Sequence, residues 1–372
     1  MPNTPTQSAS ATHVTRDGDT YLTFGGCNYL GLAHHPAVIS AAQSALSTFG
    51  LSTSASRQTT GNAQPHSDLE SQLIKFTSAP SARLLPDGYT ANLSALQALA
   101  SLGITHAIID ARAHSSLHDA AKLAQLTTHT YNHLNTAHAS SILAAINQPT
   151  VILTDSVFTT DGTITPAPQL LELIKNTPHY LLLDDCHGFG VLGNQGRGIA
   201  DHFNLKQHNL VVTTTLLKGL GCAGGVVLAN TQLIESITNT STAYICTTPA
   251  SPALSSAAIT ALDLLQSDPN LHASLRSNID QTRKILNSLS IQTHQYPTSI
   301  FAFTLGTEES MLQIEQELLN QQVILPLMHY PHGPAPTFFR LAVNACHTKA
   351  DLQHLKKSLN EALTIYTDTL SP

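Results

Sequence analysis

The sequence predicts an α/β protein of 372 residues, with a large domain built on a mainly parallel sheet covered by helices and a smaller α+β domain at the C-terminus. The length exceeds what one hydrophobic core usually serves, which favours two domains. Short, nearly continuous apolar runs alternate with helical patterns, as in parallel strands that helices cover on both faces. The predicted strands of the large domain are Thr150–Asp155, Tyr180–Asp185, Asn209–Thr215 and Gly224–Ala229.

The pattern changes in the last part of the chain. A helical pattern with few breakers runs from Pro249 to about Ser288 and is long enough to join two domains. Strand and helix patterns then alternate, which is typical of an α+β domain. The expected elements are Ser299–Leu305, Glu308–Gln322, Phe338–Val343 and Thr348–Tyr366. We therefore divide the chain into an N-terminal segment (1–35), a large domain (36–270) and a C-terminal domain (271–372). Upstream, the S-x-x-E sequence from Ser67 to Glu70 predicts that a helix begins there.

Composition limits the partners of this protein. Hydrophobic residues make up 42% of the chain and charged residues only 11%, so subunit contacts are expected on a surface with few charges. The net charge of −7 comes without a basic stripe, which argues against nucleic acid as a partner. No apolar run approaches the roughly 18 residues of a membrane span, and residues 1–14 lack the pattern of a secretory signal. With five cysteines and no C-x-x-C pair, a cytoplasmic protein is predicted.

Several predicted strands end in polar residues, where open α/β sheets bind their ligands. Asp155, Asp184, Asp185 and Thr215 occupy such ends, although they could also form ordinary turns. Lys218 follows the strand that ends at Thr215 and precedes a glycine-rich turn, in the sequence TLLKGLG. Glycines let a bulky ligand approach the backbone, and apolar surroundings favour a nucleophilic amine. A surface lysine would give the same pattern.

Two histidines accompany these strand ends. His187 closes the D-D-x-H sequence that begins at Asp184, which could hold a metal, form a turn or place a carboxylate beside a protonated ligand nitrogen. His114 precedes a predicted helix, where its ring could stack on a ligand and transfer protons, or serve the fold as most of the 20 histidines do. His118 lies four residues further on, but the spacing offers no third ligand, and we predict no metal site.

The segment DGYTAN, Asp87–Asn92, precedes the helical pattern of residues 93–100. Backbone N–H groups at a helix start, with a glycine for close approach, form a phosphate site, although the same pattern begins ordinary helices. The sequence contains no G-x-x-x-x-G-K-[ST] loop, so a nucleoside triphosphate is not supported.

In this order and spacing, the segments resemble the α-oxoamine synthase family of fold-type-I enzymes, which use pyridoxal 5′-phosphate (PLP). The similarity covers nearly the whole chain from Tyr21 onward, and eight motifs in register carry it. They are NYLGLAHHP (Asn28–Pro36), SASRQTTGN with a following His66 and LE (Ser54–Glu70), DGYTAN (Asp87–Asn92), DARAHSS (Asp110–Ser116), TDSVFTTDG (Thr154–Gly162), DDCHGFGVLGNQGRG (Asp184–Gly198), TLLKGLG (Thr215–Gly221) and CTTPASP (Cys246–Pro252).

The resemblance implies a role for each matching residue. The catalytic residues would be Lys218, which carries the Schiff base and removes the α-proton, Asp184 at the pyridine nitrogen, and His114 on the ring face. The other cofactor contacts would come from His187 and Thr159 at the phenolic oxygen, from Gly88, Tyr89 and Thr215 at the phosphate, and from Thr247 or Thr248 of a partner subunit. Substrate would be held by Asn28 and by Arg340, whose guanidinium suits bidentate binding of an amino-acid carboxylate.

The implied reaction is the decarboxylative condensation of a small amino acid with an acyl thioester of CoA or of an acyl-carrier protein, which gives an α-amino ketone. The family member that this chain resembles most joins L-alanine to a pimeloyl thioester in biotin synthesis. Because active sites of this family lie at a dimer interface, a homodimer with a shared active site is implied.

The sequence departs from the family pattern in places that concern substrate choice. Cys27 stands where asparagine is common, Leu217 replaces a small residue before the lysine, and Leu327–Phe338 lacks the usual R-P-P-T-V-P sequence. A serine palmitoyltransferase-like or glycine C-acetyltransferase-like member of the family is therefore an alternative. An aminotransferase or aldolase on the same fold, and a homologue without activity, are further alternatives; retention of Lys218, Asp184 and His114 argues against the last.

Overall fold

The computed structural model describes residues 4–206, 208–330 and 333–369, with side chains as far as residue 364. The chain forms two compact units, here called unit 1 and unit 2. Unit 2 consists of His35–Phe158 and Ile164–Asp268, and unit 1 of residues up to His34, Thr159–Thr163 and the chain from Pro269 onward. The predicted borders at residues 35 and 270 lie beside these limits, and the division into three domains stays a prediction.

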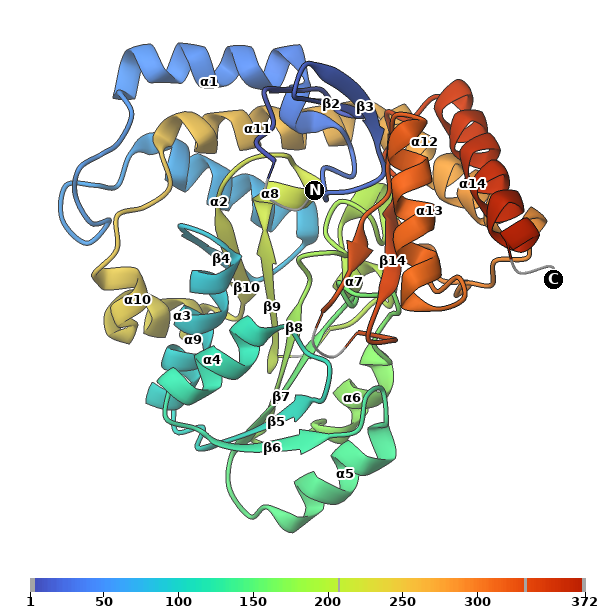
Figure 1. Ribbon diagram of the computed structural model, residues 1–372. Coiled ribbons are helices and arrows are strands. Elements are labelled where there is room, and N and C mark those ends of the chain that lie inside the picture. The colour runs from blue at the N-terminus through green and yellow to red at the C-terminus, as the bar shows by residue number, and fades with distance from the viewer. Residues whose placement is uncertain (1–3, 207, 331–332, 370–372) are drawn as a thin grey trace. The chain divides into compact units, whose positions relative to one another are not determined.

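Unit 2 is built on a seven-stranded sheet with the order β4-β10-β9-β8-β7-β5-β6 (Figure 1). Its strands are β4 Ser81–Leu85, β5 His106–Asp110, β6 Thr127–Tyr131, β7 Thr150–Asp155, β8 Tyr180–Asp184, β9 Leu210–Thr215 and β10 Gly225–Ala229. Only β10 runs against the others, since it pairs antiparallel with both β4 and β9. The mainly parallel sheet is confirmed, but the direction of β10 could not be predicted, because an apolar run does not reveal which way its strand points.

Helices cover both faces of this sheet. One face carries α3 Gly88–Ser101, α4 Ser115–Leu123, α9 Thr231–Thr240 and α10 Thr242–Ile245, and the other α5 Thr136–Ala145, α6 Ala167–Leu173 and α7 Ile199–His202. The remaining helices of unit 2 are α1 Pro36–Phe49, α2 Gln64–Thr77, the 3-10 turn η2 Asn194–Gly196, α8 Leu216–Gly219 and α11 Pro252–Ser267. Of these, α11 packs against both α1 and α2.

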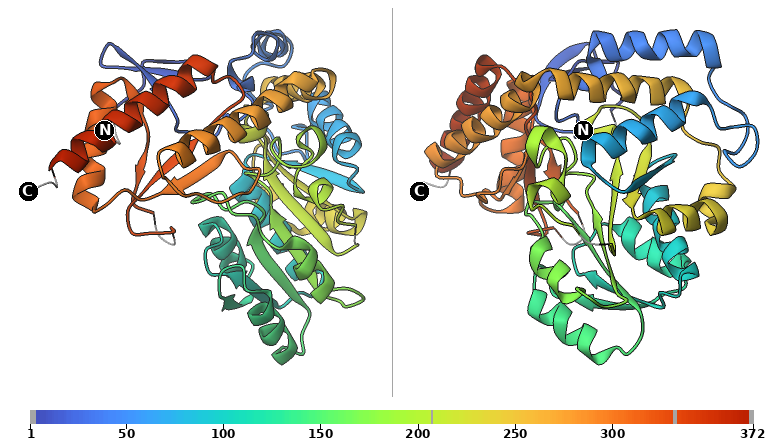
Figure 2. Two further views of the ribbon diagram at one scale, coloured as in Figure 1. Left: turned by 90° about the vertical axis from the view of Figure 1, so that its right-hand side faces the viewer. Right: turned by 180° about the vertical axis from the view of Figure 1, so that it is seen from behind.

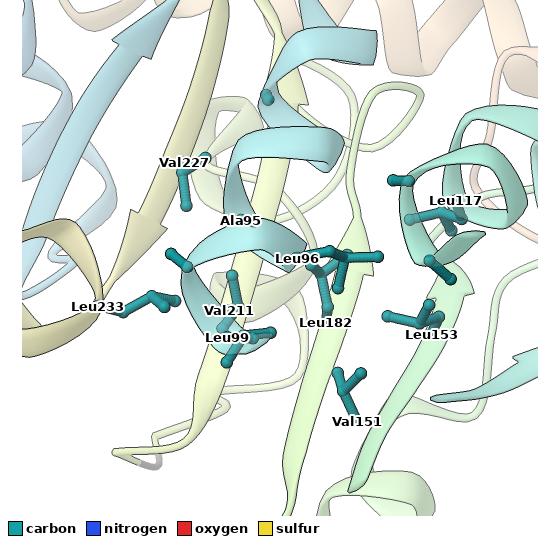
Figure 3. Packing of buried hydrophobic residues seen from close by; sticks show 14 of the residues in the cluster. Ala95, Leu96, Leu99, Leu117, Val151, Leu153, Leu182, Val211, Val227 and Leu233 are labelled. Atoms are coloured by element: carbon teal, nitrogen blue, oxygen red, sulfur yellow. The ribbon is translucent and has the colours of Figure 1, made fainter. Parts of the chain in front are cut away.

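The helix α3 packs closely on the centre of the sheet. Its residues Ala95, Leu96 and Leu99 are fully buried, and Figure 3 shows them against Leu182 of β8 and Val211 of β9. Apolar residues at this spacing give the helix one face to bury. The packing fixes where α3 begins, at the carboxyl ends of β8 and β9.

Unit 1 has α+β character. Its strands form a four-stranded sheet, β1 Ser8–Ala9, β2 His13–Arg16, β3 Asp19–Thr23 and β12 Val323–Ile324, and a three-stranded sheet, β11 Ile300–Phe303, β14 Phe338–Ala342 and β13 Leu327–Met328. Its helices are the 3-10 turn η1 Leu32–His34, α12 Pro269–Ser288, α13 Glu308–Asn320 and α14 Lys349–Thr369. The orange α13 and the red α14 lie side by side (Figure 2). Parallel pairing of β3 with β12 joins the two ends of the chain in one unit.

Three predicted helix limits are wrong. The helix expected over residues 93–100 begins at Gly88, because Asp87 caps it there. The helix expected from Ser67 begins three residues earlier, because the ring nitrogen of His66 accepts a hydrogen bond from the N–H of Ala63 at 3.2 Å and so caps α2. The helical stretch expected from Pro249 to Ser288 is two helices, α11 and α12. The chain leaves the helical conformation at Asp268, the residue before Pro269, and proline then opens the next helix. In the described ranges, no helix has both the length and the apolar character needed to cross a membrane.

Candidate active site

The carboxyl ends of four parallel strands of unit 2 surround one cavity of about 180 Å³. The strands are β5, β7, β8 and β9, and the chain order reverses between β5 and β7. Such a switch point is where an open α/β sheet binds its ligand. The cavity is lined by Gly88, Tyr89, His114, Ser116, Asp155, Val157, Asp184, Cys186, His187, Thr215, Leu217 and Lys218. Seven of the predicted cofactor residues are thus brought together: Gly88, Tyr89, His114, Asp184, His187, Thr215 and Lys218.

Asp184 ends β8, and both oxygens of its buried carboxylate accept hydrogen bonds. The side-chain amide of Asn92, on α3, donates to Oδ2 at 2.7 Å, and the backbone N–H of Cys186 donates to Oδ1 at 3.0 Å. Hydrogen bonds to the ionised form favour it, so these donors support a carboxylate rather than a neutral acid. This negative charge faces the cavity.

His114 lies at the start of α4 with its ring in the cavity wall. Its Nδ1 accepts the N–H of Ser116 at 3.3 Å and lies 2.8 Å from the hydroxyl of the same serine. Its own backbone N–H donates to Asp155 Oδ1 at 3.1 Å. Burial lowers the pKa of His114 below its usual range, so the imidazole is neutral at neutral pH.

Asp155, at the end of β7, is a second carboxyl group in the cavity wall. Burial and then the nearby Asp184 raise the pKa of Asp155 well above its usual range. Two like charges close together in one buried site are costly. We conclude that Asp155 favours its protonated form at neutral pH.

Lys218 is half-buried on α8, and its amine lies 2.7 Å from Nε2 of His187. Thr215 fixes the start of this short helix: its hydroxyl accepts the N–H of Leu217 at 3.2 Å and donates to the carbonyl of Gly224 at 3.1 Å. The amine of Lys218 and the imidazole of His187 thus lie next to each other in the wall of the cavity.

The N-terminus of α3 forms another part of the wall. Asp87 caps the helix by accepting the N–H of Thr90 at 2.7 Å. A Cβ atom added at Gly88 would lie 3.1 Å from Sγ of Cys186 and 3.2 Å from Cβ of Thr215, so only glycine leaves this corner open. The first N–H groups of a helix have no partner within it and favour an anion. The half-exposed Tyr89 donates its hydroxyl to Asp119 at 2.7 Å.

Asp185 faces away from the cavity although it follows Asp184 directly. Its carboxylate accepts hydrogen bonds from the hydroxyl of Ser156 and, at 2.9 Å, from the N–H of Ile199. Burial raises the pKa of Asp185 to about 7. In the part of the chain that the structure describes, no group of three or more His, Cys, Asp or Glu side chains could hold a metal ion.

Three predicted site residues belong to unit 1. Arg340, on β14, is buried; its Nε donates to the carbonyl of Thr159 at 2.6 Å, and its Nη2 lies 3.8 Å from Sγ of Cys27. Asn28 accepts the N–H of Ala33 at 3.4 Å. Within the described part of unit 1, no carboxylate forms an ion pair with Arg340.

Two more predicted residues, Thr247 and Thr248, follow α10 in unit 2 and do not line the cavity. The hydroxyl of Thr247 donates to the carbonyl of Ala243 at 2.7 Å. Their predicted contact with the cofactor of a partner subunit stays a prediction.

Sequence reasoning gave no role to Asn92 and Ser116, although both lie in quoted motifs. Asn92 is four residues after Gly88 and hence on the same face of α3, the face that meets the strand ends. That periodicity was the available signal for Asn92. No signal in the sequence pointed to Ser116, because the hydrogen bond between Asn92 and Ser116 depends on how two helices pack.

Solved structures with the same fold identify the class of protein. Serine palmitoyltransferase from S. paucimobilis, solved with a bound PLP–myriocin aldimine, matches 97% of this chain and 92% of its own with a TM-score of 0.91 and 25% identity. The 8-amino-7-oxononanoate synthase of Francisella tularensis matches 94% of this chain and 98% of its own with a TM-score of 0.78 and 23% identity. The fold is that of the type-I PLP transferases, as predicted.

The family model for class I and II aminotransferases matches residues 19–359, and the chain belongs to that family. Curated relatives include an 8-amino-7-oxononanoate synthase of Methylobacillus flagellatus, 35% identical over 92% of this chain and 87% of the relative. Another of the same name, from Pseudomonas syringae pv. tomato, is 34% identical over 95% of this chain and 90% of the relative. The predicted resemblance to the α-oxoamine synthases is confirmed.

Proposed function

We propose that this chain is a PLP-dependent 8-amino-7-oxononanoate synthase, which condenses L-alanine with a pimeloyl thioester to an α-amino ketone with loss of CO₂. The observation that carries the proposal is the joint placement of Lys218, Asp184 and His114 on one cavity, in a chain whose curated relatives bear that name.

The residues around the cavity fit PLP. Bound PLP supplies an electron sink for the carbanion that forms when the α-proton of an amino acid leaves. The Asp184 carboxylate would hold a proton on the pyridine nitrogen, and the neutral ring of His114 would lie against the cofactor. The open corner at Gly88 and the helix N-terminus of α3 suit the phosphate, with Thr215 beside them.

Proton movement at the substrate falls to Lys218 and His187. The Lys218 amine would bind the cofactor and move the α-proton, a task within the reach of a positioned side chain. His187, with Nε2 at 2.7 Å from that amine, would hold it in place and share its proton. Thr159 keeps its predicted place at the phenolic oxygen of the cofactor as part of this proposal.

Arg340 would bind the carboxylate of the amino acid, with Asn28 nearby in the same unit. A buried guanidinium without an ion-pair partner is costly, and an incoming carboxylate would supply the missing charge. The planar fork of arginine matches a carboxylate with two parallel hydrogen bonds.

The enzyme would act as a cytoplasmic homodimer with a shared active site. Tyr89 and Leu217, which line the cavity, are 44% and 59% exposed in the single chain. Large apolar groups exposed beside a cavity favour cover by a partner. A second copy would then bring Thr247 or Thr248 to the phosphate, as the family resemblance implies.

A serine palmitoyltransferase-like activity is the second candidate, supported by the TM-score of 0.91 with that enzyme and by the unusual Cys27. Purified protein with PLP should be offered alanine, serine or glycine, each with pimeloyl-CoA, pimeloyl-acyl-carrier protein or palmitoyl-CoA, with products read by mass spectrometry. We expect 8-amino-7-oxononanoate from alanine and a pimeloyl thioester. A long-chain product from serine would favour the second candidate, and keto acids without thiol release would favour an aminotransferase.

A further inference from the structure

Asn92 lies beneath the cavity and is hydrogen-bonded to two parts of its wall. The side chain is 1% exposed. Its amide nitrogen donates to Asp184 Oδ2 at 2.7 Å and to Ser116 Oγ at 2.9 Å, and its amide oxygen accepts the hydroxyl of Thr213 at 2.5 Å. One amide therefore joins α3, α4, β8 and β9 under the proposed cofactor site.

The network fixes which way the amide points. Turning it by 180° would place Oδ1 of Asn92 against a carboxylate oxygen of Asp184, where two acceptors repel. In the observed orientation Ser116 Oγ accepts a hydrogen bond from Asn92, so the Ser116 hydroxyl donates its own hydrogen bond to Nδ1 of His114, 2.8 Å away. Since Nδ1 also accepts the N–H of Ser116, the neutral ring carries its proton on Nε2.

We propose that Asn92 is a positioning residue for the PLP site, which holds the Asp184 carboxylate in place and, through Ser116, sets the tautomer of His114. The inference rests on the proposed function, because it assigns Asp184 to the ring nitrogen and His114 to the ring face. Asn92 itself does not line the cavity and needs no contact with the cofactor.

Loss of the amide has a definite physical consequence. The Asp184 carboxylate would keep one donor instead of two, so it would no longer be fixed in position against the ring nitrogen. A ring nitrogen beside a misplaced carboxylate is less protonated, so a second proton elsewhere on the bound cofactor is less disfavoured. The pH midpoint of the bound-PLP absorbance should therefore move to higher pH.

The test compares Asn92→Ala with Ser94→Ala. Ser94 is a matched control, because it is fully buried on the same helix and its hydroxyl has no hydrogen-bond partner among the described residues. We expect Asn92→Ala to raise the dissociation constant of PLP for the apo-protein about tenfold, as for a lost hydrogen bond to a charged group. The absorbance midpoint should rise, and kcat should fall more than KM changes. Ser94→Ala should leave all four values near those of the unchanged protein.

Two further variants keep the test decisive if Asn92→Ala does not fold. Thr213→Val removes the donor that orients the amide and should move the midpoint in the same direction by less, whereas Ser116→Ala breaks the link to His114. Unchanged midpoint and PLP affinity in Asn92→Ala, or in Thr213→Val if only that variant folds, would overturn the inference. Failure of the unchanged protein to bind PLP would instead overturn the proposed function.

Discussion

The cavity of unit 2 and the Arg340 cluster of unit 1 are built in opposite ways. Around the cavity, the Asp184 carboxylate accepts two hydrogen bonds, and the Lys218 amine lies 2.7 Å from the imidazole of His187. In unit 1, the buried Arg340 meets the carbonyl of Thr159, the thiol of Cys27 and the side chain of Tyr29, with no carboxylate ion-paired to it in the described part of that unit. The polar groups of the first region pair with one another, while the guanidinium of the second has no carboxylate. Under the proposed function, the first region would hold the cofactor and the second would select the amino acid.

Lys218→Ala should have the largest effect, because among the described residues Lys218 alone brings an amine to the cavity. We expect turnover to fall by roughly 10⁴-fold with every substrate pair, since the proposed function gives Lys218 both cofactor attachment and proton movement. Steady-state assays and the absorbance of bound PLP report the two losses. Lys175→Ala, at an exposed lysine paired with Glu172, is the control. Turnover within tenfold of the unchanged protein would contradict the assignment.

Arg340→Lys should have the next largest effect and should spare the cofactor. An ammonium cannot reproduce the planar fork or the bond from Nε to the carbonyl of Thr159. We expect KM for the amino acid to rise roughly 10- to 100-fold, the loss of one or two charge-assisted hydrogen bonds. PLP absorbance should be unchanged. If PLP affinity falls instead of substrate affinity, the contrast between the two regions is wrong.

Cys27→Asn should have a small and favourable effect on substrate binding. An amide in place of the thiol 3.8 Å from Arg340 Nη2 offers both an acceptor for the guanidinium and a donor for the substrate. We expect KM for the amino acid to fall by about two- to tenfold. The same kinetic assay measures this, with Cys346→Ser as a control thiol of the same unit. An equal change in the control would show a general effect of removing a thiol.

Asp185→Asn should have the smallest effect on turnover, because this carboxyl faces away from the cavity. Its effect should be on stability. The pKa of Asp185 is raised from 3.8 to about 7 by burial, so the folded protein binds a proton that the unfolded chain has lost over this range. The associated free energy of unfolding, on the order of 4 kcal/mol, is present below about pH 4 and lost as the pH rises to about 7. Urea unfolding of the apo-protein should show a flatter pH dependence in the variant; an unchanged slope would place the proton elsewhere.

The elements that the sequence predicted well are the buried strands, because their position follows from runs of apolar residues. The strands β7, β8, β9 and β10 match their predicted runs within one residue, since a strand buried on both faces must be apolar throughout. The strands β1, β2 and β3 were not predicted, because they are short and largely polar. Their place in unit 1 follows from pairing with β12, some 300 residues away in the chain.

The candidate site also has a part that the sequence predicted and a part that it did not. Motif order placed Lys218, Asp184 and His114 on one cavity, because each follows a strand and the strands are parallel. The bonds of Asn92 to Asp184 and Ser116 depend on angles between helices and strands, which no spacing along the chain contains.

The reversed strand β10 has a consequence for how this site can evolve. Its first residue, Gly225, pairs with both Leu85 and Thr215, so it lies between the loop that leads into α3 and the end of β9. A Cβ atom there would overlap the carbonyl of Asp87, the residue that caps α3. A side chain at Gly225 would therefore disturb the start of α3 and the pairing of an inner strand at the same time, so substitutions at this position are disfavoured on two grounds.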